Sequence, residues 1–152
     1  MKILDVLTTD TIIADLNAHD KKGILEELAA PVARQAGVET ETLVKVLLER
    51  EQLGSTGIGG GIGIPHGKLK SLESLVLGFG RSRQGVNFES MDGKPTHIFF
   101  LLLTPEDSAG LHLKLLARIS RLLKNDTFKE RLMLSQTSED IITAIGEEDE
   151  DF

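Results

Sequence analysis

A glycine-rich segment that ends in histidine carries the most distinctive chemistry of this sequence. Glycine fills seven of the fourteen positions from Gly54 to Gly67, although the whole chain of 152 residues contains only 15 glycines. Glycine tolerates positive φ angles and lets a ligand approach the backbone closely, and successive N–H groups in such a turn form a concave anion site. The segment therefore predicts a phosphate-binding loop, although its composition also fits a flexible surface loop.

His66 stands near the end of this segment, between Pro65 and Gly67. The proline has a fixed φ and the glycine adds minimal bulk, so the imidazole is well presented. A neutral imidazole, with an unperturbed pKa of about 6.5, can accept a phosphoryl group without first losing a proton. Ser55 and Thr56 would need activation for the same reaction. A histidine that is merely exposed in a loop is the alternative, but the neighbouring residues favour a nucleophile.

Two further side chains could support a phosphoryl group on His66. Arg50 lies one turn before the loop and could offer planar, permanently charged donors to phosphoryl oxygens. His112 is expected in the first turn of a helix, where backbone N–H groups favour an anion and disfavour imidazolium. Alternatively, Arg50 is a solvated partner of Glu49 or Glu51, and His112 is a polar position on an apolar helix.

Known nucleotide and metal motifs do not fit this chain. The P-loop pattern fails because Ile62 stands in place of its first glycine and Leu69 replaces the magnesium-binding hydroxyl residue. A dinucleotide-binding turn fails because the glycine segment follows a helix rather than a strand. The chain has no cysteine, and its four histidines lack metal-ligand spacing. His19 and His97 are interpreted as structural, and neither a metal nor a cofactor is expected.

Length and composition favour one domain in a reducing compartment. The net charge of −7 is concentrated at Glu147–Asp151, and without those five residues the chain has 17 basic against 19 acidic side chains. We therefore expect a domain over residues 1–146 and a disordered acidic tail over 147–152. The absence of a basic stripe and of Trp and Tyr disfavours nucleic-acid binding. No apolar run suits a signal peptide or membrane insertion, so a cytoplasmic location is expected.

Hydrophobic periodicity predicts helices on both sides of a central set of strands. Asp20 and Gly37 suit the two ends of the first helix, and Thr137 to Asp140 fits a capping box for the last, which Gly146 would close. Helices are expected at residues 20–37, 40–53, 111–124, 128–134 and 138–145, and strands at 75–81, 97–103 and 86–88. This order favours an α/β (α+β) fold, with a mixed sheet sandwiched between helices.

The segment LEREQLGSTGIGGGIGIPHGK, from Leu48 to Lys68, resembles the signature of the fructose/mannitol-type enzyme IIA family of the bacterial phosphoenolpyruvate-dependent phosphotransferase system. The similarity extends across nearly the whole chain, because Thr104–Asp107 and the HLKLLARISRLL segment that begins at His112 resemble the family's second conserved region. Both segments are most similar to the nitrogen-regulatory branch. Gly63 departs from the pattern, since relatives more often have alanine or another small residue there.

The resemblance implies a phosphotransferase whose His66 accepts a phosphoryl group from a small phosphocarrier protein, HPr or its nitrogen-branch relative. It implies supporting roles for Arg50 and His112, and phosphate-binding or loop roles for Ser55, Thr56, Gly57 and Gly67. No metal is required for this transfer. Ile58, Ile62 and Leu111 are expected to form an apolar rim against the carrier.

Two functions follow from the resemblance. In the preferred one, the phosphorylation state of His66 regulates contacts with other proteins, such as kinases, transporters or transcription regulators. In the alternative, the chain passes the phosphoryl group to a separate sugar-specific IIB domain for sugar uptake. Because IIB accepts on a cysteine and this chain has none, it cannot complete sugar phosphorylation alone.

Overall fold

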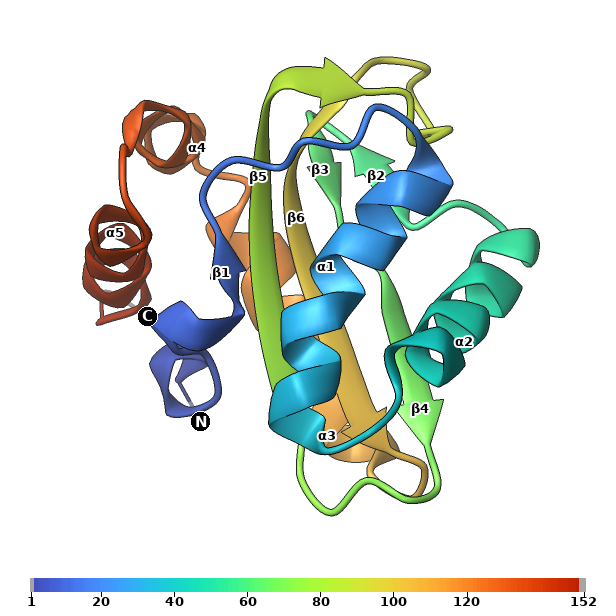
Figure 1. Ribbon diagram of the computed structural model, residues 1–152. Helices are drawn as coiled ribbons and strands as arrows, with labels where there is room; N and C mark the ends of the chain where they lie inside the picture. The colour runs from blue at the N-terminus through green and yellow to red at the C-terminus, as the bar shows by residue number, and fades with distance from the viewer. Residues whose placement is uncertain (1, 151–152) are drawn as a thin grey trace.

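Helices cover both faces of one mixed sheet in the computed structural model, which describes residues 2–150 (Figure 1). Helices α1 and α2 lie in front of the sheet in this view, α3 lies behind it, and α4 and α5 lie beside each other at one edge. The helices are α1 (Lys21–Ala36), α2 (Thr40–Gln52), α3 (Ala109–Leu122), α4 (Asp126–Leu134) and α5 (Ser138–Glu150). The strands are β1 (Ile12–Ile13), β2 (Gly57–Gly59), β3 (Ile62–Gly63), β4 (His66–Leu69), β5 (Val76–Val86) and β6 (Thr96–Pro105).

The long antiparallel pair β5 and β6 forms the centre of the sheet. The strand order is β1-β5-β6-β3-β2, and β4 also pairs with β6. Strands β3 and β4 both run parallel to β6, at Ile98 and Phe99 for β3 and from Leu102 onward for β4. The α/β architecture with a mixed sheet between helices, expected from the sequence, is confirmed.

The side chains of β6 alternate between two hydrophobic cores, as the period of two in a strand requires. One core lies against α1 and α2, and the other against α3, α4 and α5. Because helices cover both faces, the strand is apolar on both sides and shows no polar alternation. The residues that face α1 and α2 are Phe99, Leu101 and Leu103, and those that face the other helices are Ile98, Phe100 and Leu102.

The helix ends expected from the sequence are confirmed for α1. The Asp20 side chain accepts a hydrogen bond from the Gly23 N–H at 2.7 Å, and Gly37 ends the helix with a left-handed φ of 73°. At the start of α5, Thr137 and Asp140 exchange side-chain and backbone hydrogen bonds, as in a capping box. These local bonds satisfy backbone groups that a helix end leaves without partners.

The glycine-rich segment is more ordered than the loop expected from its composition. It contains β2 and β3, which pair as a hairpin around Gly60 and Gly61, and it leads directly into β4. Both turn glycines have positive φ, 66° and 81°, which explains why glycine is required there. The segment is therefore an integral edge of the sheet.

The prediction of a disordered acidic tail is wrong for residues 147–150, the part of the tail that the structure describes. Helix α5 passes through Gly146 and continues to Glu150, and Asp149 is only 1% exposed. The Asp149 carboxylate binds Arg118 Nε at 2.5 Å and accepts a hydrogen bond from the Ile3 N–H at 2.6 Å. These two contacts stabilise the acidic end of the helix, while residues 151–152 of the expected tail lie outside the described residues.

Candidate functional site

His66 begins strand β4, where the sheet holds its backbone opposite Leu102 of β6. Its side chain is partly buried, and its Nδ1 lies 2.8 Å from the carbonyl oxygen of Ile64. On the other side of the ring, Nε2 lies 3.3 Å from Nε of Arg50. The backbone that links β3 to β4 and the side chain of Arg50 on α2 thus hold the imidazole between them.

These two contacts determine which ring nitrogen of His66 carries the proton. A carbonyl oxygen only accepts hydrogen bonds, so Nδ1 donates to Ile64 and Nε2 keeps its lone pair. The Arg50 Nε–H then donates to Nε2. In the neutral ring, Nε2 is therefore the nucleophilic atom, and it points toward a guanidinium group.

The environment keeps His66 in its neutral form. Burial is the main cause of a lowered pKa, and the positive charges of Arg50 and Lys68 lower it further. The hydrogen bond to Ile64 and the negative charge of Glu51 oppose this shift but do not cancel it. At neutral pH the ring is an uncharged nitrogen nucleophile.

Helix α2 brings Arg50 to His66 because it packs against β4 at Gly67. A Cβ atom on Gly67 would lie 2.7 Å from Cγ1 of Val46, so only glycine fits between the helix and the strand. Arg50 is held at a second point, since its Nη1 donates to the carbonyl oxygen of Gly54 at 2.9 Å. The guanidinium is therefore oriented at the ring before any ligand arrives.

His112 lies on α3 with its ring against His66. The two ring centroids are 5.1 Å apart and the rings meet edge to face, at 67°. His112 is 5% exposed, and its Nδ1 lies 3.0 Å from Oγ1 of Thr104. Burial lowers the pKa of His112 to about 4, with smaller contributions from His66 and Lys68. This second imidazole is therefore neutral at neutral pH.

The structure gives the hydroxyl groups of Ser55 and Thr56 partners within the loop. Ser55 Oγ donates to the carbonyl oxygen of Phe88 at 2.9 Å and accepts the Gly57 N–H at 3.0 Å. Thr56 Oγ1 donates to the buried carboxylate of Glu51. Both hydroxyls stabilise the loop, and their expected place beside a phosphoryl group stays a prediction.

The two glycines expected in the loop stand at positions where an added Cβ atom would make a very close contact. A Cβ atom on Gly57 would lie 3.0 Å from the Cα of Ser90, in the loop after β5. Gly67 makes room for Val46, as described above. Direct contact of either glycine with phosphate stays a prediction.

Two residues of the site were missed by sequence reasoning, Glu51 and Thr104. Glu51 follows Leu43 and Leu47 at intervals of four, so it occupies the buried stripe of α2. A carboxylate in an apolar stripe is a signal that the sequence already contained. Thr104, which contacts His112, ends an apolar run and carries no comparable signal.

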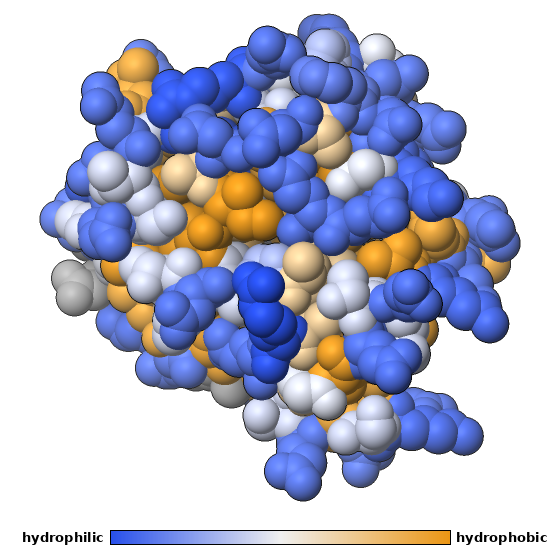
Figure 2. All heavy atoms as spheres, viewed as in Figure 1, coloured by the Kyte–Doolittle hydropathy of each residue, from blue (hydrophilic) through white to orange (hydrophobic). Residues whose placement is uncertain are grey.

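The apolar rim expected around the site is corrected at one position. Ile62 is only 4% exposed and belongs to the core beneath α3, because its strand pairs with β6. Ile58 is 45% exposed, and Leu111 is partly buried. Leu113, beside His112, is 65% exposed. The face that carries α1 and α2 is mainly hydrophilic, with apolar atoms exposed only in separate areas (Figure 2).

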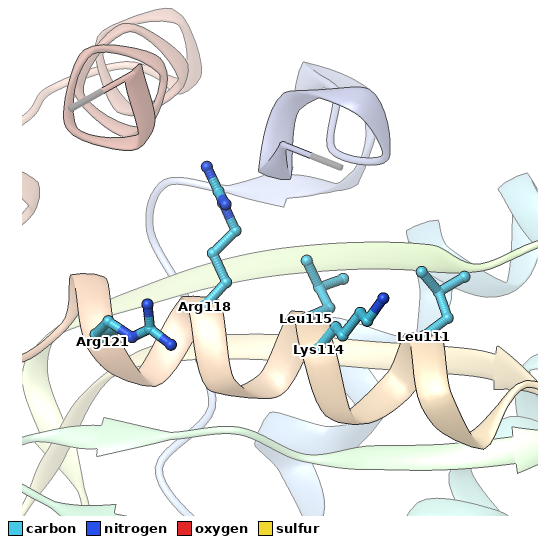
Figure 3. A pocket seen from close by; sticks show the side chains of 5 residues that line it. All are labelled: Leu111, Lys114, Leu115, Arg118 and Arg121. Atoms are coloured by element: carbon cyan, nitrogen blue, oxygen red, sulfur yellow. The ribbon is translucent and has the colours of Figure 1, made fainter. Parts of the chain in front are cut away.

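A cavity of about 230 Å³ lies along α3, the helix that carries His112. Three basic side chains and two leucines line it, and Figure 3 shows Arg118 rising from the helix while Lys114 and Arg121 lie along it. Arg118 forms an ion pair with the buried Asp149. The cavity therefore adjoins the contact that joins α3 to α5.

Within residues 2–150, no group of three His, Cys, Asp or Glu side chains is arranged to hold a metal ion. In the same range, no helix is both long and apolar enough to cross a lipid bilayer. The chemistry that the described site offers is that of two neutral imidazoles beside one guanidinium.

Comparison with known proteins gives concordant results. The family described as "Phosphoenolpyruvate-dependent sugar phosphotransferase system, EIIA 2" matches residues 5–148. A nitrogen regulatory protein of Bradyrhizobium diazoefficiens is 41% identical over 146 residues, which cover 96% of this chain and 95% of that protein. The fructose-specific EIIABC component of Bacillus subtilis is 34% identical over 98% of this chain, but only 24% of that protein is covered. The crystal structure of the nitrogen regulatory protein IIA-Ntr from Neisseria meningitidis superposes with a TM-score of 0.88 at 31% identity, over 93% of this chain and 97% of that one.

Proposed function

The chain belongs to the EIIA 2 family of the phosphoenolpyruvate-dependent sugar phosphotransferase system, whose members are phosphotransfer components, and we propose that it accepts a phosphoryl group on His66. The donor is the phosphohistidine of a small carrier protein, HPr or its nitrogen-branch relative. One observation carries the proposal. Nδ1 of His66 donates a hydrogen bond to the carbonyl oxygen of Ile64, so the lone pair is on Nε2, which lies 3.3 Å from Nε of Arg50.

The proposed transfer is an in-line displacement between two imidazoles. The Nε2 lone pair of His66 forms a bond to phosphorus as the nitrogen–phosphorus bond of the donor breaks, and the donor ring recovers its electron pair. The proton on Nδ1 of His66 stays in its hydrogen bond to Ile64. No general acid or base is needed, so catalysis comes from positioning and charge stabilisation.

Arg50 has two successive partners in this mechanism. Before transfer it donates to Nε2, and when phosphorus arrives there the guanidinium turns its donors to the phosphoryl oxygens. The bond to Gly54 keeps the group nearby during that exchange. His112 is neutral before transfer, and a phosphoryl anion beside it favours its protonated form, which then contributes positive charge.

The role that follows phosphorylation is proposed to be regulatory. The support is the similarity to nitrogen regulatory proteins over nearly their whole length, at 41% identity for the Bradyrhizobium diazoefficiens protein. Phosphorylation changes the charge at His66, and we propose that partner proteins such as kinases or transporters distinguish the two states. We propose that the site works in the cytoplasm, as the sequence predicts.

Transfer to a separate IIB domain is the alternative. It is favoured by the match to the fructose-specific EIIABC component of Bacillus subtilis, in which this chain corresponds to about a quarter of the protein. If the purified phosphorylated chain lost its phosphoryl group rapidly to the cysteine of a IIB domain, this second role would replace the first.

The test is intact-mass spectrometry at alkaline pH after incubation with phosphoenolpyruvate, enzyme I and the carrier protein. The wild type and a His19→Ala control, altered at an exposed histidine, are expected to gain the mass of one phosphoryl group that acid removes. His66→Ala is expected to gain none. The proposal fails if the wild type stays unmodified with both carrier proteins, or if His66→Ala is modified equally.

A further inference from the structure

Glu51 is a buried carboxylate that the transfer mechanism does not use directly. It is 8% exposed and lies next to Arg50 in the last turn of α2. Lys21 of α1 places its Nζ 2.8 Å from one carboxylate oxygen. The other described hydrogen bonds of the Glu51 side chain come from one residue of the glycine-rich segment, since Thr56 donates both its backbone N–H, at 3.0 Å, and its hydroxyl group.

A continuous series of hydrogen bonds leads from Glu51 to the imidazole of His66. The carbonyl oxygen of Thr56 accepts the Ile64 N–H at 3.0 Å. The carbonyl oxygen of Ile64 in turn lies 2.8 Å from Nδ1 of His66. The carboxylate thus fixes Thr56, Thr56 fixes Ile64, and Ile64 determines which nitrogen of His66 carries the proton.

Stability alone does not account for a carboxylate at this position. Leu43 and Leu47 occupy the same buried stripe, and a third apolar residue would fill it without the desolvation penalty of a charge. The carboxylate does what an apolar residue cannot, because it binds two donors of Thr56 at once. These two hydrogen bonds hold a segment in which seven glycines increase the conformational entropy that is lost on folding.

We infer that Glu51 is a positioning residue that, through Thr56 and Ile64, holds His66 with its proton on Nδ1 and its lone pair on Nε2. This inference rests on the proposed function, because it assigns Glu51 to the same transfer. Glu51 has no described hydrogen bond with His66. Besides the effect of its negative charge on the pKa of His66, it acts through these two residues. Since α2 carries both Arg50 and Glu51, one helix end places the guanidinium and also sets the state of the ring that it faces.

The test compares Glu51→Gln with Glu49→Gln, a matched change at an exposed position two residues earlier. Two-bond proton–nitrogen NMR spectra of the neutral imidazole report which nitrogen of His66 carries the proton. We expect Nδ1 in the wild type and in Glu49→Gln, and a mixture of both tautomers in Glu51→Gln. The single-turnover rate of phosphoryl transfer should fall about 10- to 100-fold in Glu51→Gln, with an unchanged KM for the carrier protein.

A second pair of variants covers the case in which Glu51→Gln does not fold. Thr56→Val removes the hydroxyl that donates to Glu51, while Thr56→Ser keeps it. We expect Thr56→Val to shift the tautomer and slow the transfer, and Thr56→Ser, which keeps the hydroxyl, to change both less than Thr56→Val does. A role in stability alone would lower the melting temperature of these variants and leave the tautomer unchanged.

The outcomes separate this inference from the proposed function. If the wild type accepts a phosphoryl group and the folded Glu51→Gln variant matches it in tautomer and rate, the positioning role is wrong and the phosphotransfer function stands. If the wild type and Glu49→Gln accept no phosphoryl group, the proposed function itself fails.

Discussion

His112 shows how burial sets the charge state of this site. Its side chain is almost fully buried, and desolvation is the main reason that its pKa is about 4 rather than 6.5. In the unfolded chain the same ring is solvated and takes up a proton below a pH of about 6.5. Folding therefore competes with protonation of His112 at mildly acidic pH.

The first prediction is a pH dependence of stability that His112 causes. Because its pKa is depressed in the folded state, its contribution is fully present above pH 6.5 and is lost as the pH falls toward about 4. Between pH 7 and pH 5 the wild type should lose on the order of 2 kcal/mol more unfolding free energy than His112→Gln. Urea titrations of both proteins at the two pH values measure this difference, and parallel losses would contradict it.

The central residues of the site could be predicted from the sequence because their chemistry is visible in single residues. His66, Arg50 and His112, separated by up to 62 positions, meet as the sequence reasoning required, although their roles in transfer stay predictions. The partners of Ser55 and Thr56 could not be predicted, because a hydroxyl serves a loop or a ligand equally well. Only the fold shows that the Ser55 hydroxyl donates to Phe88 and the Thr56 hydroxyl to Glu51.

At the scale of the elements, the site depends on how closely α2 approaches β4. Val46 contacts the strand where Gly67 has no side chain, and one turn later the same helix presents Arg50 to His66. A wider gap between helix and strand would move the guanidinium away from the ring. Gly67 thus acts on the chemistry through packing.

The second prediction concerns this contact. Gly67→Ala should destabilise the fold by about 1–3 kcal/mol, because its Cβ would lie 2.7 Å from Val46 Cγ1. Adding Val46→Ala removes the obstructing methyl group, so the double variant should be more stable than Gly67→Ala alone. Urea unfolding of both single variants and the double variant forms the test. A double variant no more stable than Gly67→Ala would show that the collision is not the cause.

The helices were more predictable than the short strands for a physical reason. Helix α1 carries its own end signals, an N-cap at Asp20 and a left-handed glycine at Gly37. Strands β3 and β4 are two and four residues long, and both join the main sheet by pairing with β6, more than thirty residues later. Such pairing is non-local, and a glycine-rich sequence does not reveal it.

At the scale of the whole molecule, Asp149 connects three separate parts of the chain. Its carboxylate binds the Ile3 N–H and the guanidinium of Arg118, so α5, the first residues and α3 meet at one buried charge. The acidic sequence around it predicted a solvated run, because its partner Arg118 lies 31 residues away. One residue of that run is in fact a structural anchor.

The third prediction compares two acidic residues of α5. Asp149→Ala should cost about 3–5 kcal/mol of unfolding free energy, because it removes a buried carboxylate that two groups bind. Glu147→Ala removes the partner of Arg131 in a pair that is about half exposed, and should cost about 1 kcal/mol or less. Chemical denaturation measures both changes. Equal losses would show that the acidic end of α5 contributes only net charge.

The hydrogen bond between Ile3 and Asp149 also brings the first and last elements of the described chain together, and these two elements lie on the same side of the molecule in Figure 1. A short polar linker between these two elements could therefore close the described chain into a ring without displacing a helix or strand. New ends could then open in an exposed turn, such as the one at Gly93. The arrangement of helices and strands therefore does not depend on where the chain begins. A circularly permuted chain could still bring Arg50, His66 and His112 together.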